Sequence, residues 1–259
     1  MEPGFIMVGA SRAGTTSLFQ ALSAHPQVLR PAVNKGVRYF DLNYPRGMDW
    51  YLGHFPLRWT GRRGSQRGGP ATAFEASGYY IYHPFAVPRI AEDLPGIRIV
   101  AMLRDPVERA YSAWKHESAR GFESESFERS LELEDERLAG EVERMAADPN
   151  YESFSHRHHS HRSRGEYDTQ LERIFAHFPR EQVHVIQSEA FFAEPDREFD
   201  RLVRFLGLER FQPASFEKVN ARPSAPMDPA VEASLRRHFA PHDARLAELL
   251  GEPLGWSRG

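Results

Sequence analysis

Apolar residues along the chain fall into short continuous runs, separated by longer stretches in which they recur at helical spacing. The runs predict buried strands at 5–8, 71–74, 98–103 and 182–187. The longer stretches predict helices at 16–24, 106–120, 167–178, 195–206 and 228–250. Strands that alternate with helices favour a parallel sheet with crossover connections. The pattern therefore predicts an α/β fold in which a central, mainly parallel sheet is flanked by helices.

A glycine-rich turn joins the first predicted strand to the first predicted helix. Gly9 and Gly14 have the spacing of a P-loop, G-x-x-x-x-G-K-[ST], and Thr16 supplies its hydroxyl. Thr15 stands at the lysine position, and the basic group comes earlier, at Arg12. Such a turn still presents backbone N–H groups to an anion, but it lacks the lysine that holds a triphosphate. The turn predicts an anion site in a three-layer, P-loop-like fold.

A second basic position follows the strand at 98–103. Arg104 comes directly after this strand, and Ser112 lies two helical turns further on. Ligands of open α/β sheets bind beyond the carboxyl ends of the strands, which is the edge that also holds the glycine turn. An arginine at such a place is often a structural ion-pair partner. Together with the glycine turn, however, the guanidinium and the hydroxyl predict a clamp for a second phosphate group.

Composition narrows the class of protein. The chain has 259 residues, of which 41% are hydrophobic and 27% charged, as expected for one soluble globular domain over 1–259. A net charge of −3 does not favour a nucleic-acid partner, and the absence of cysteine excludes disulfides, thiolate metal sites and cysteine nucleophiles. No apolar run approaches the roughly 20 residues of a membrane helix. We therefore expect no membrane span and a cytoplasmic location.

The motifs, in their order along the chain, resemble those of sulfotransferases that use 3′-phosphoadenosine 5′-phosphosulfate (PAPS). The resemblance rests on the segment 9–18, on His25-Pro26 and on the segment 103–112, and it extends to 249–251. It is nearest to the bacterial and heparan-sulfate-type branch. It implies one sulfotransferase domain that moves a sulfuryl group to a hydroxyl or amine of a small-molecule, glycan or lipid acceptor.

The resemblance also implies which residues bind the donor. In the family, the first loop holds the 5′-phosphosulfate, and an arginine and a serine eight residues apart hold the 3′-phosphate. The residues that match the first loop are Arg12, Ala13, Gly14, Thr15, Thr16 and Ser17. Arg104 and Ser112 match the second pair, and Arg222 resembles part of a further 3′-phosphate loop. Most members have lysine where Arg12 stands, although tyrosylprotein sulfotransferases resemble this chain in having arginine.

Transfer of a sulfuryl group moves negative charge from an attacking oxygen to a leaving phosphate oxygen. Positioning and fixed cations supply much of the catalysis in such a reaction. We expect Arg12 and Lys35 to stabilise the bridging oxygen and the transferring group. No predicted strand ends in an aspartate suited to bind Mg²⁺, so we expect no metal requirement.

The residue that deprotonates the acceptor is less evident. Gly36 stands where heparan-type members have a glutamate that acts as the base. His116 lies one helical turn after Ser112, at the position of a histidine implicated in heparan N-sulfotransferases, and imidazole titrates in the useful range. Glu75 follows the predicted strand 71–74 and is the second candidate. The competing interpretations are a surface histidine for His116 and a buried partner of an arginine for Glu75.

Three further segments have unusual composition. The stretch 123–148 predicts a solvated helical face with one packed apolar stripe. The segment 58–69 holds four arginines among glycines, and a solvated surface loop is favoured over a basic lip for an anionic ligand. Four histidines within 156–161 favour a polar loop beside the acceptor or in solvent over a metal site, since no carboxylate pattern accompanies them.

Aromatic residues between 50 and 82 predict either an acceptor site or core, and the loops at 43–69 and 123–164 are expected to shape the acceptor pocket. Two other functions remain open. A P-loop nucleotide kinase is disfavoured by Thr15 at the lysine position. A nucleotide-binding protein without turnover is suggested by Gly36.

Overall fold

The computed structural model describes residues 1–32, 34–57, 71–216 and 226–256. The chain forms two compact units, which are described separately below. The first unit comprises Met1–Leu103 with Ile174–Ala221, and the second comprises Arg104–Arg173 with Arg222–Gly259. The single domain over 1–259 stays a prediction.

A five-stranded parallel sheet forms the centre of the first unit. Its strands are β1 (Pro3–Gly9), β2 (Val28–Leu29), β3 (Thr72–Ala76), β4 (Arg98–Leu103) and β5 (Val183–Gln187). They lie in the order β2-β3-β1-β4-β5, and every neighbouring pair is parallel. The predicted α/β architecture is confirmed. The short strand β2 was not predicted, because two residues are too few to show a periodic pattern.

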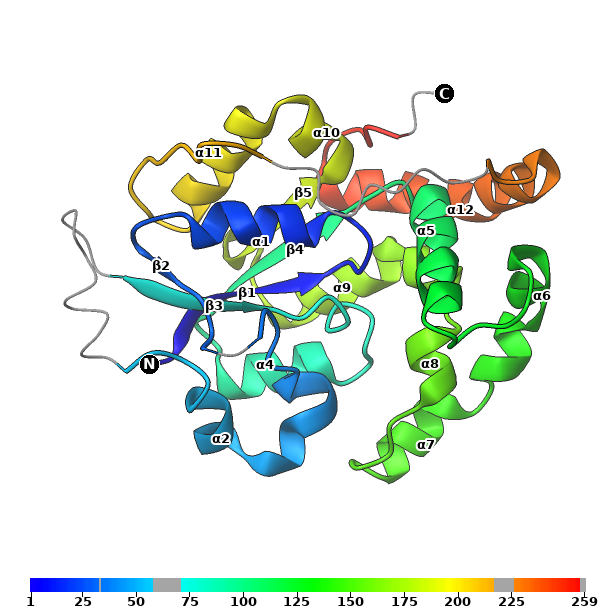
Figure 1. Ribbon diagram of the computed structural model, residues 1–259, viewed down its shortest axis with the longest axis horizontal. Coiled ribbons are helices and arrows are strands. Elements are labelled where there is room, and N and C mark those ends of the chain that lie inside the picture. The colour runs from blue at the N-terminus through cyan, green and yellow to red at the C-terminus, as the bar shows by residue number, and fades with distance from the viewer. Residues whose placement is uncertain (33, 58–70, 217–225, 257–259) are drawn as a thin grey trace. The chain divides into compact units, whose positions relative to one another are not determined.

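Helices cover both faces of this sheet (Figure 1). On one side lie α1 (Thr15–Ser23), α10 (Ser188–Ala193) and α11 (Pro195–Phe205), and on the other lie α2 (Met48–Leu52) and α4 (Ala86–Asp93). The rings of Phe5 and Phe74 stack on neighbouring strands with centroids 4.8 Å apart, and Phe19 of α1 packs 5.0 Å from Phe74. This layer of aromatic contacts joins α1 to the sheet and so holds the turn before it.

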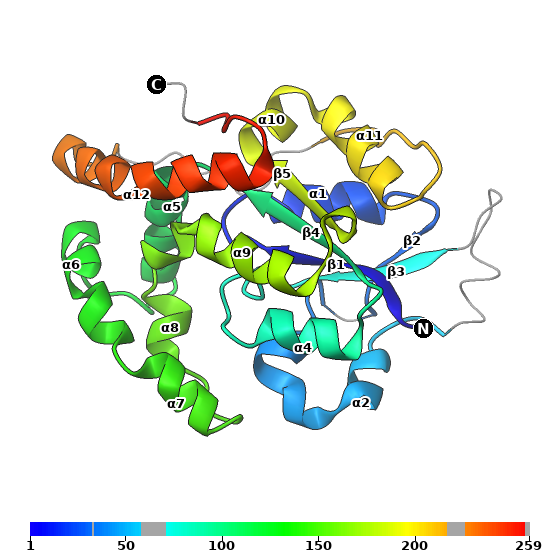
Figure 2. The ribbon, with the colours of Figure 1, turned by 180° about the vertical axis from the view of Figure 1, so that it is seen from behind.

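The second unit is helical. It contains α5 (Pro106–Ala119), α6 (Phe127–Leu138), α7 (Glu141–Ala147), α8 (Phe154–His158) and α12 (Pro229–Leu250), and α9 (Tyr167–His177) begins within it. α12 is the long helix seen from behind in Figure 2. A core cluster of the second unit consists of Val107, Ala110, Phe127, Leu235 and Phe239. Among the helices in the described ranges, none combines the length and the apolar character that a bilayer crossing requires.

The stretch 123–148 departs only in part from its prediction. It is helical, as α6 and α7, and Phe127 and Met145 of the apolar stripe are buried, but three of its acidic side chains are buried rather than solvated. Glu134 accepts hydrogen bonds from the backbone N–H groups of Arg162 and Ser163, both at 2.7 Å. Glu123 pairs with Arg137 at 2.7 Å. The charge pattern was misleading because these carboxylates bind a distant loop and a neighbouring helix inside the unit.

The predicted polar histidine loop is also wrong. Residues 154–158 form α8, and His156, His158 and His161 are buried. His158 Nδ1 lies 2.8 Å from Glu117, and burial lowers the pKa of His156 to about 3 and that of His161 to about 4. These histidines are therefore neutral or hydrogen-bonded core residues. The arginine-rich segment 58–69 lies outside the described residues.

Candidate active site

The glycine turn after β1 is shaped by close contacts. Gly14 is the N-cap of α1 with φ of 93°, and a Cβ atom there would lie 2.9 Å from the ring of Phe192. A Cβ atom at Gly9 would lie 2.5 Å from the Ile81 side chain. Both glycines are therefore required by space and by their backbone angles, φ of 150° at Gly9 and 93° at Gly14. α1 has no side-chain cap, and the Ser17 N–H of its first turn donates to the Gly14 carbonyl at 3.0 Å.

The turn is anchored to its neighbours on both sides. The backbone N–H of Ala10 donates to the Met102 carbonyl at 2.7 Å, and Ser11 donates to the Gly78 carbonyl through both its N–H and its hydroxyl. These bonds hold the turn between the ends of β4 and β3. A rigid turn before a helix N-terminus forms an anion site without reorganisation, because its dipoles are already oriented.

Lys35 reaches this turn from another part of the chain. Its Nζ atom donates to the hydroxyls of Thr15 at 3.0 Å and Thr16 at 3.4 Å. Burial lowers the pKa of Lys35 to about 8. The structure thus brings together Lys35 and the turn, both of which were predicted as site residues. The Lys35 amine lies beside Thr15, the position at which a P-loop has its own lysine. Arg12 lies in the turn with φ of 72°, and its catalytic role stays a prediction.

Glu75 takes a different position from the one expected. It lies within β3, it is 0% exposed, and it accepts hydrogen bonds from the Val37 N–H at 2.7 Å, Ser77 at 3.0 Å and Tyr80 at 3.1 Å. Burial raises the pKa of Glu75 to about 7, although these bonds oppose the rise. The carboxylate therefore fastens the segment after Lys35 to the sheet. The alternative interpretation, in which Glu75 pairs with an arginine, does not match the structure either. The groups that donate to Glu75 are a backbone N–H and two hydroxyls.

The presence of glycine at position 36 is explained by how closely this segment packs against β3. The backbone N–H of Ala76 donates to the Lys35 carbonyl at 2.9 Å, which brings Gly36 against β3. A Cβ atom at Gly36 would lie 2.5 Å from the Ser77 hydroxyl and 2.8 Å from the Ala76 carbonyl. A carboxylate cannot stand at this position unless the backbone shifts. The residue that activates the acceptor must therefore come from elsewhere.

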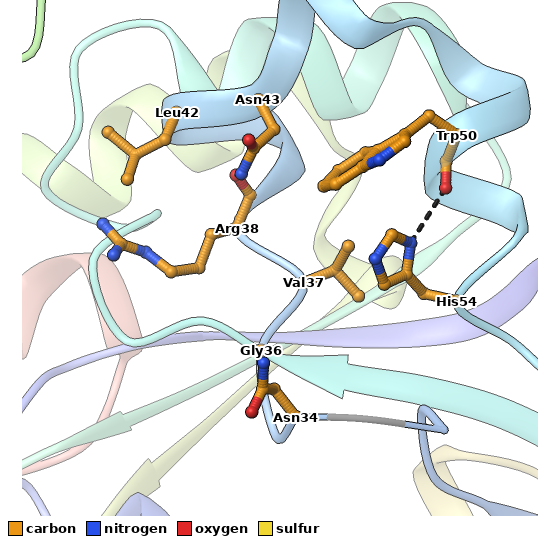
Figure 3. Close-up of a pocket in the computed structure, with 8 residues that line it drawn as sticks. All are labelled: Asn34, Gly36, Val37, Arg38, Leu42, Asn43, Trp50 and His54. Carbon is orange, nitrogen blue, oxygen red and sulfur yellow. Dashed lines mark hydrogen bonds between the residues drawn. The ribbon is translucent and has the colours of Figure 1, made fainter.

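A pocket of about 280 Å³ opens beside Gly36 (Figure 3). It is lined by Asn34, Gly36, Val37, Arg38, Leu42, Asn43, Trp50 and His54. Arg38 and Leu42 lie on one side, and Trp50 and His54 lie on the other. Of the aromatic residues considered in the sequence, Trp50 lines this pocket, whereas Tyr51, Phe55 and Tyr80 are core. Trp59 lies outside the described residues.

Two residues of the pocket, His54 and Arg38, are held by hydrogen bonds to neighbouring residues. His54 Nδ1 lies 2.8 Å from the Trp50 carbonyl, and since a carbonyl only accepts, Nδ1 carries the proton. In neutral His54 the Nε2 atom is then the proton acceptor. Arg38 has φ of 60°, an uncommon angle for a residue with a side chain, and its carbonyl accepts from the Asn43 side chain at 2.9 Å. Neither residue was predicted individually as a site residue, although His54 lies within the 43–69 segment that was expected to shape the acceptor pocket.

Residues 2–226 match the family model of the sulfotransferase domain. The chain belongs to this family. A crystal structure of a sulfotransferase from Alicyclobacillus acidocaldarius is 31% identical in sequence, covers 100% of both chains and has a TM-score of 0.74. The family predicted from the motifs is thereby confirmed, and so is the fold.

Curated sulfotransferases are more distant and longer. The membrane-associated sulfotransferase kil1 of Dictyostelium discoideum is 26% identical over 98% of this chain and 66% of its own length. The human bifunctional heparan sulfate N-deacetylase/N-sulfotransferase 3 is 27% identical over 99% of this chain and 31% of its own length. The chain therefore spans about two thirds of one relative and under a third of the other.

The remaining predicted site residues belong to the second unit of this sulfotransferase-family chain. Arg104 follows β4 directly and pairs with Glu108 at 3.2 Å, with 31% of its side chain exposed. Ser112 and His116 lie one helical turn apart on α5, and both are partly buried. Their contacts with a donor stay predictions. Arg222 lies outside the described residues.

Proposed function

We propose that the protein transfers a sulfuryl group from PAPS to a hydroxyl or amine of an acceptor. The observation that carries this proposal is the position of Lys35 at the glycine turn of a sulfotransferase-family chain. A P-loop kinase places its lysine within the loop, whereas here the amine comes from another segment and the loop position is Thr15. This favours a phosphosulfate over a triphosphate.

The residues of the turn fit the donor's 5′ end. The N–H groups at the start of α1 and the hydroxyls of Thr15, Thr16 and Ser17 would hold its phosphate. PAPS, when bound, supplies the sulfuryl group and a leaving phosphate oxygen. Lys35 and Arg12 would stabilise the charge that develops on that oxygen, and Arg104 with Ser112 would hold the 3′-phosphate. The predicted absence of a metal requirement and the cytoplasmic location stay predictions.

The pocket beside Gly36 is the proposed acceptor site. Its volume of about 280 Å³ lies near the lower end for small-molecule sites, so its described part suits one ring or a chain end. Trp50 offers a flat apolar face, Arg38 lies on the opposite side, and Asn43 adds a second polar side chain. This combination favours a small, polar acceptor group that bears a hydroxyl or an amine, whether free or at the end of a glycan or lipid.

Ligand stabilisation tests the donor. We expect the desulfated product 3′-phosphoadenosine 5′-phosphate (PAP) to raise the melting temperature more than Mg²⁺-ATP at equal concentration, because only PAP carries the 3′-phosphate. Stabilisation by Mg²⁺-ATP alone would support the kinase alternative instead. Transfer of labelled sulfate from PAPS to a panel of hydroxyl and amine acceptors then separates turnover from binding without turnover.

His54 is the proposed base in the acceptor pocket. We expect His54→Asn to lower kcat by about 100-fold, because asparagine can still donate to the Trp50 carbonyl but cannot accept a proton. The measurement is initial rates with an acceptor found in the panel. His177→Asn is the matched control, since His177 is exposed on α9. Unchanged kcat in His54→Asn together with a large loss in His116→Ala would move the base to His116.

A further inference from the structure

Three possible metal ligands gather in the second unit. Glu166, His238 and His242 each place a ligand atom within 4.8 Å of the others. His238 and His242 are four residues apart on α12, so they share one face, and their ring centroids are 5.3 Å apart. Glu166 directly precedes α9. Within the described ranges no other such group occurs.

The hydrogen bonds of these histidines match those of a metal site. Asp168, which is 0% exposed, lies 2.9 Å and 3.1 Å from His242 Nδ1. A carboxylate that accepts from one imidazole nitrogen orients the ring and leaves the lone pair on the other nitrogen, as in the carboxylate–histidine pairs behind zinc ligands. His238 Nε2 lies 3.0 Å from Glu166 Oε1. A metal ion would replace the proton shared by these two atoms.

The site is open to an ion and balanced in charge. The side chains of Glu166, His238 and His242 are 26%, 32% and 24% exposed, so an ion can enter from solvent. Arg245 lies 3.6 Å from the buried Asp168 and so offsets part of its charge. The negative charge of Glu166 is then left for a cation.

We propose that Glu166, His238 and His242 form a Zn²⁺ site that fastens α12 to the start of α9. Two imidazoles and one carboxylate suit Zn²⁺, whereas Mg²⁺ and Ca²⁺ prefer oxygen ligands. Water completes the tetrahedral set. Asp168 is a positioning residue that acts through His242. The buried histidines of the 156–161 segment do not meet at one point, so they form no competing site.

Calorimetric titration with Zn²⁺ tests the site. Chelator-treated full-length protein should bind one equivalent and gain melting temperature on binding. We expect His238→Ala combined with His242→Ala to weaken Zn²⁺ binding by at least about 100-fold, because two of three ligands are lost. His177→Ala, which removes an exposed histidine elsewhere, should bind as the wild type does. Absence of Zn²⁺ binding by the wild type, or equal binding by the double variant, overturns the proposal.

A second measurement does not depend on the folding of the double variant. X-ray absorption of the Zn²⁺-loaded wild type should show two imidazole ligands with oxygen ligands, and any other number of imidazoles contradicts the site. Asp168→Asn should lower the affinity by about 10- to 100-fold while the same two imidazoles remain. Because PAP binding belongs to a different set of residues, PAP should stabilise the metal-free protein, so the two proposals fail independently.

Discussion

Lys35→Ala is expected to lower kcat/KM for sulfuryl transfer by about 100- to 1,000-fold, with the fold intact. The amine lies 3.0 Å from Thr15 at the start of α1, and its attachment to β3 holds it there before any donor arrives. Removing a preorganised cation from a partly buried site raises the barrier most where charge develops. The measurement is kcat/KM for PAPS at saturating acceptor, with melting temperature as the check on folding.

The pH dependence of kcat/KM also tests the role of Lys35. Because burial lowers the pKa of Lys35 to about 8, the free enzyme loses this positive charge as pH rises through that value. We therefore expect kcat/KM to fall above about pH 8, since kcat/KM reports the free enzyme. Lys35→Arg should shift that decline to higher pH. Arg204→Ala removes an exposed cation of the same unit and serves as the control. Wild-type kcat/KM in Lys35→Ala would contradict the proposed role.

Glu75→Ala is expected to destabilise the protein by about 3 kcal/mol at pH 6, because it leaves a cavity and three buried donors without their acceptor. These donors are the Val37 N–H and the hydroxyls of Ser77 and Tyr80. Glu75→Gln keeps the shape and an acceptor oxygen, so it should cost about 1 kcal/mol or less. Urea unfolding of both variants measures the difference. Equal stability of the two would show that this network does not hold the segment after Lys35.

The pKa of Glu75 also predicts the pH dependence of stability. The folded pKa of about 7 exceeds the ordinary glutamate pKa of 4.5, so the folded state keeps a proton that the unfolded chain releases between these values. Stability contributed by the protonated acid is full below about pH 4.5 and is lost as pH rises through 7, by about 3 kcal/mol in total. Glu75→Gln should remove this dependence, and the wild-type-minus-variant difference isolates it from other groups.

The donor half of the candidate site is largely local in sequence. Gly9, Gly14 and the hydroxyls after them are contiguous with β1 and α1, so their geometry follows from a strand, a turn and a helix. The β4 boundary at Arg98–Leu103 was predicted for the same reason, since a continuous apolar run marks a buried strand. Local patterns therefore specified the turn and the positions of the central strands β1 and β4 along the chain.

The acceptor half depends on contacts between distant segments. His54 enters the pocket from the turn after α2, whose five residues are too few for a clear periodic pattern. Glu75 was expected to face a cleft, yet it is buried because the Lys35–Val37 segment covers it. Buried carboxylates look like surface charges in a sequence, since only their partners distinguish the two.

The sequence by itself determined the α/β fold, the family and the glycine turn, because each rests on patterns that are local in the chain. Only the tertiary structure decided that Lys35 meets Thr15, that Gly36 has no room for a carboxylate, and that His54 lines the pocket beside Gly36. It likewise brought Glu166 to the histidines of α12. Such encounters depend on how distant segments pack, which no local pattern of hydrophobic and polar residues records.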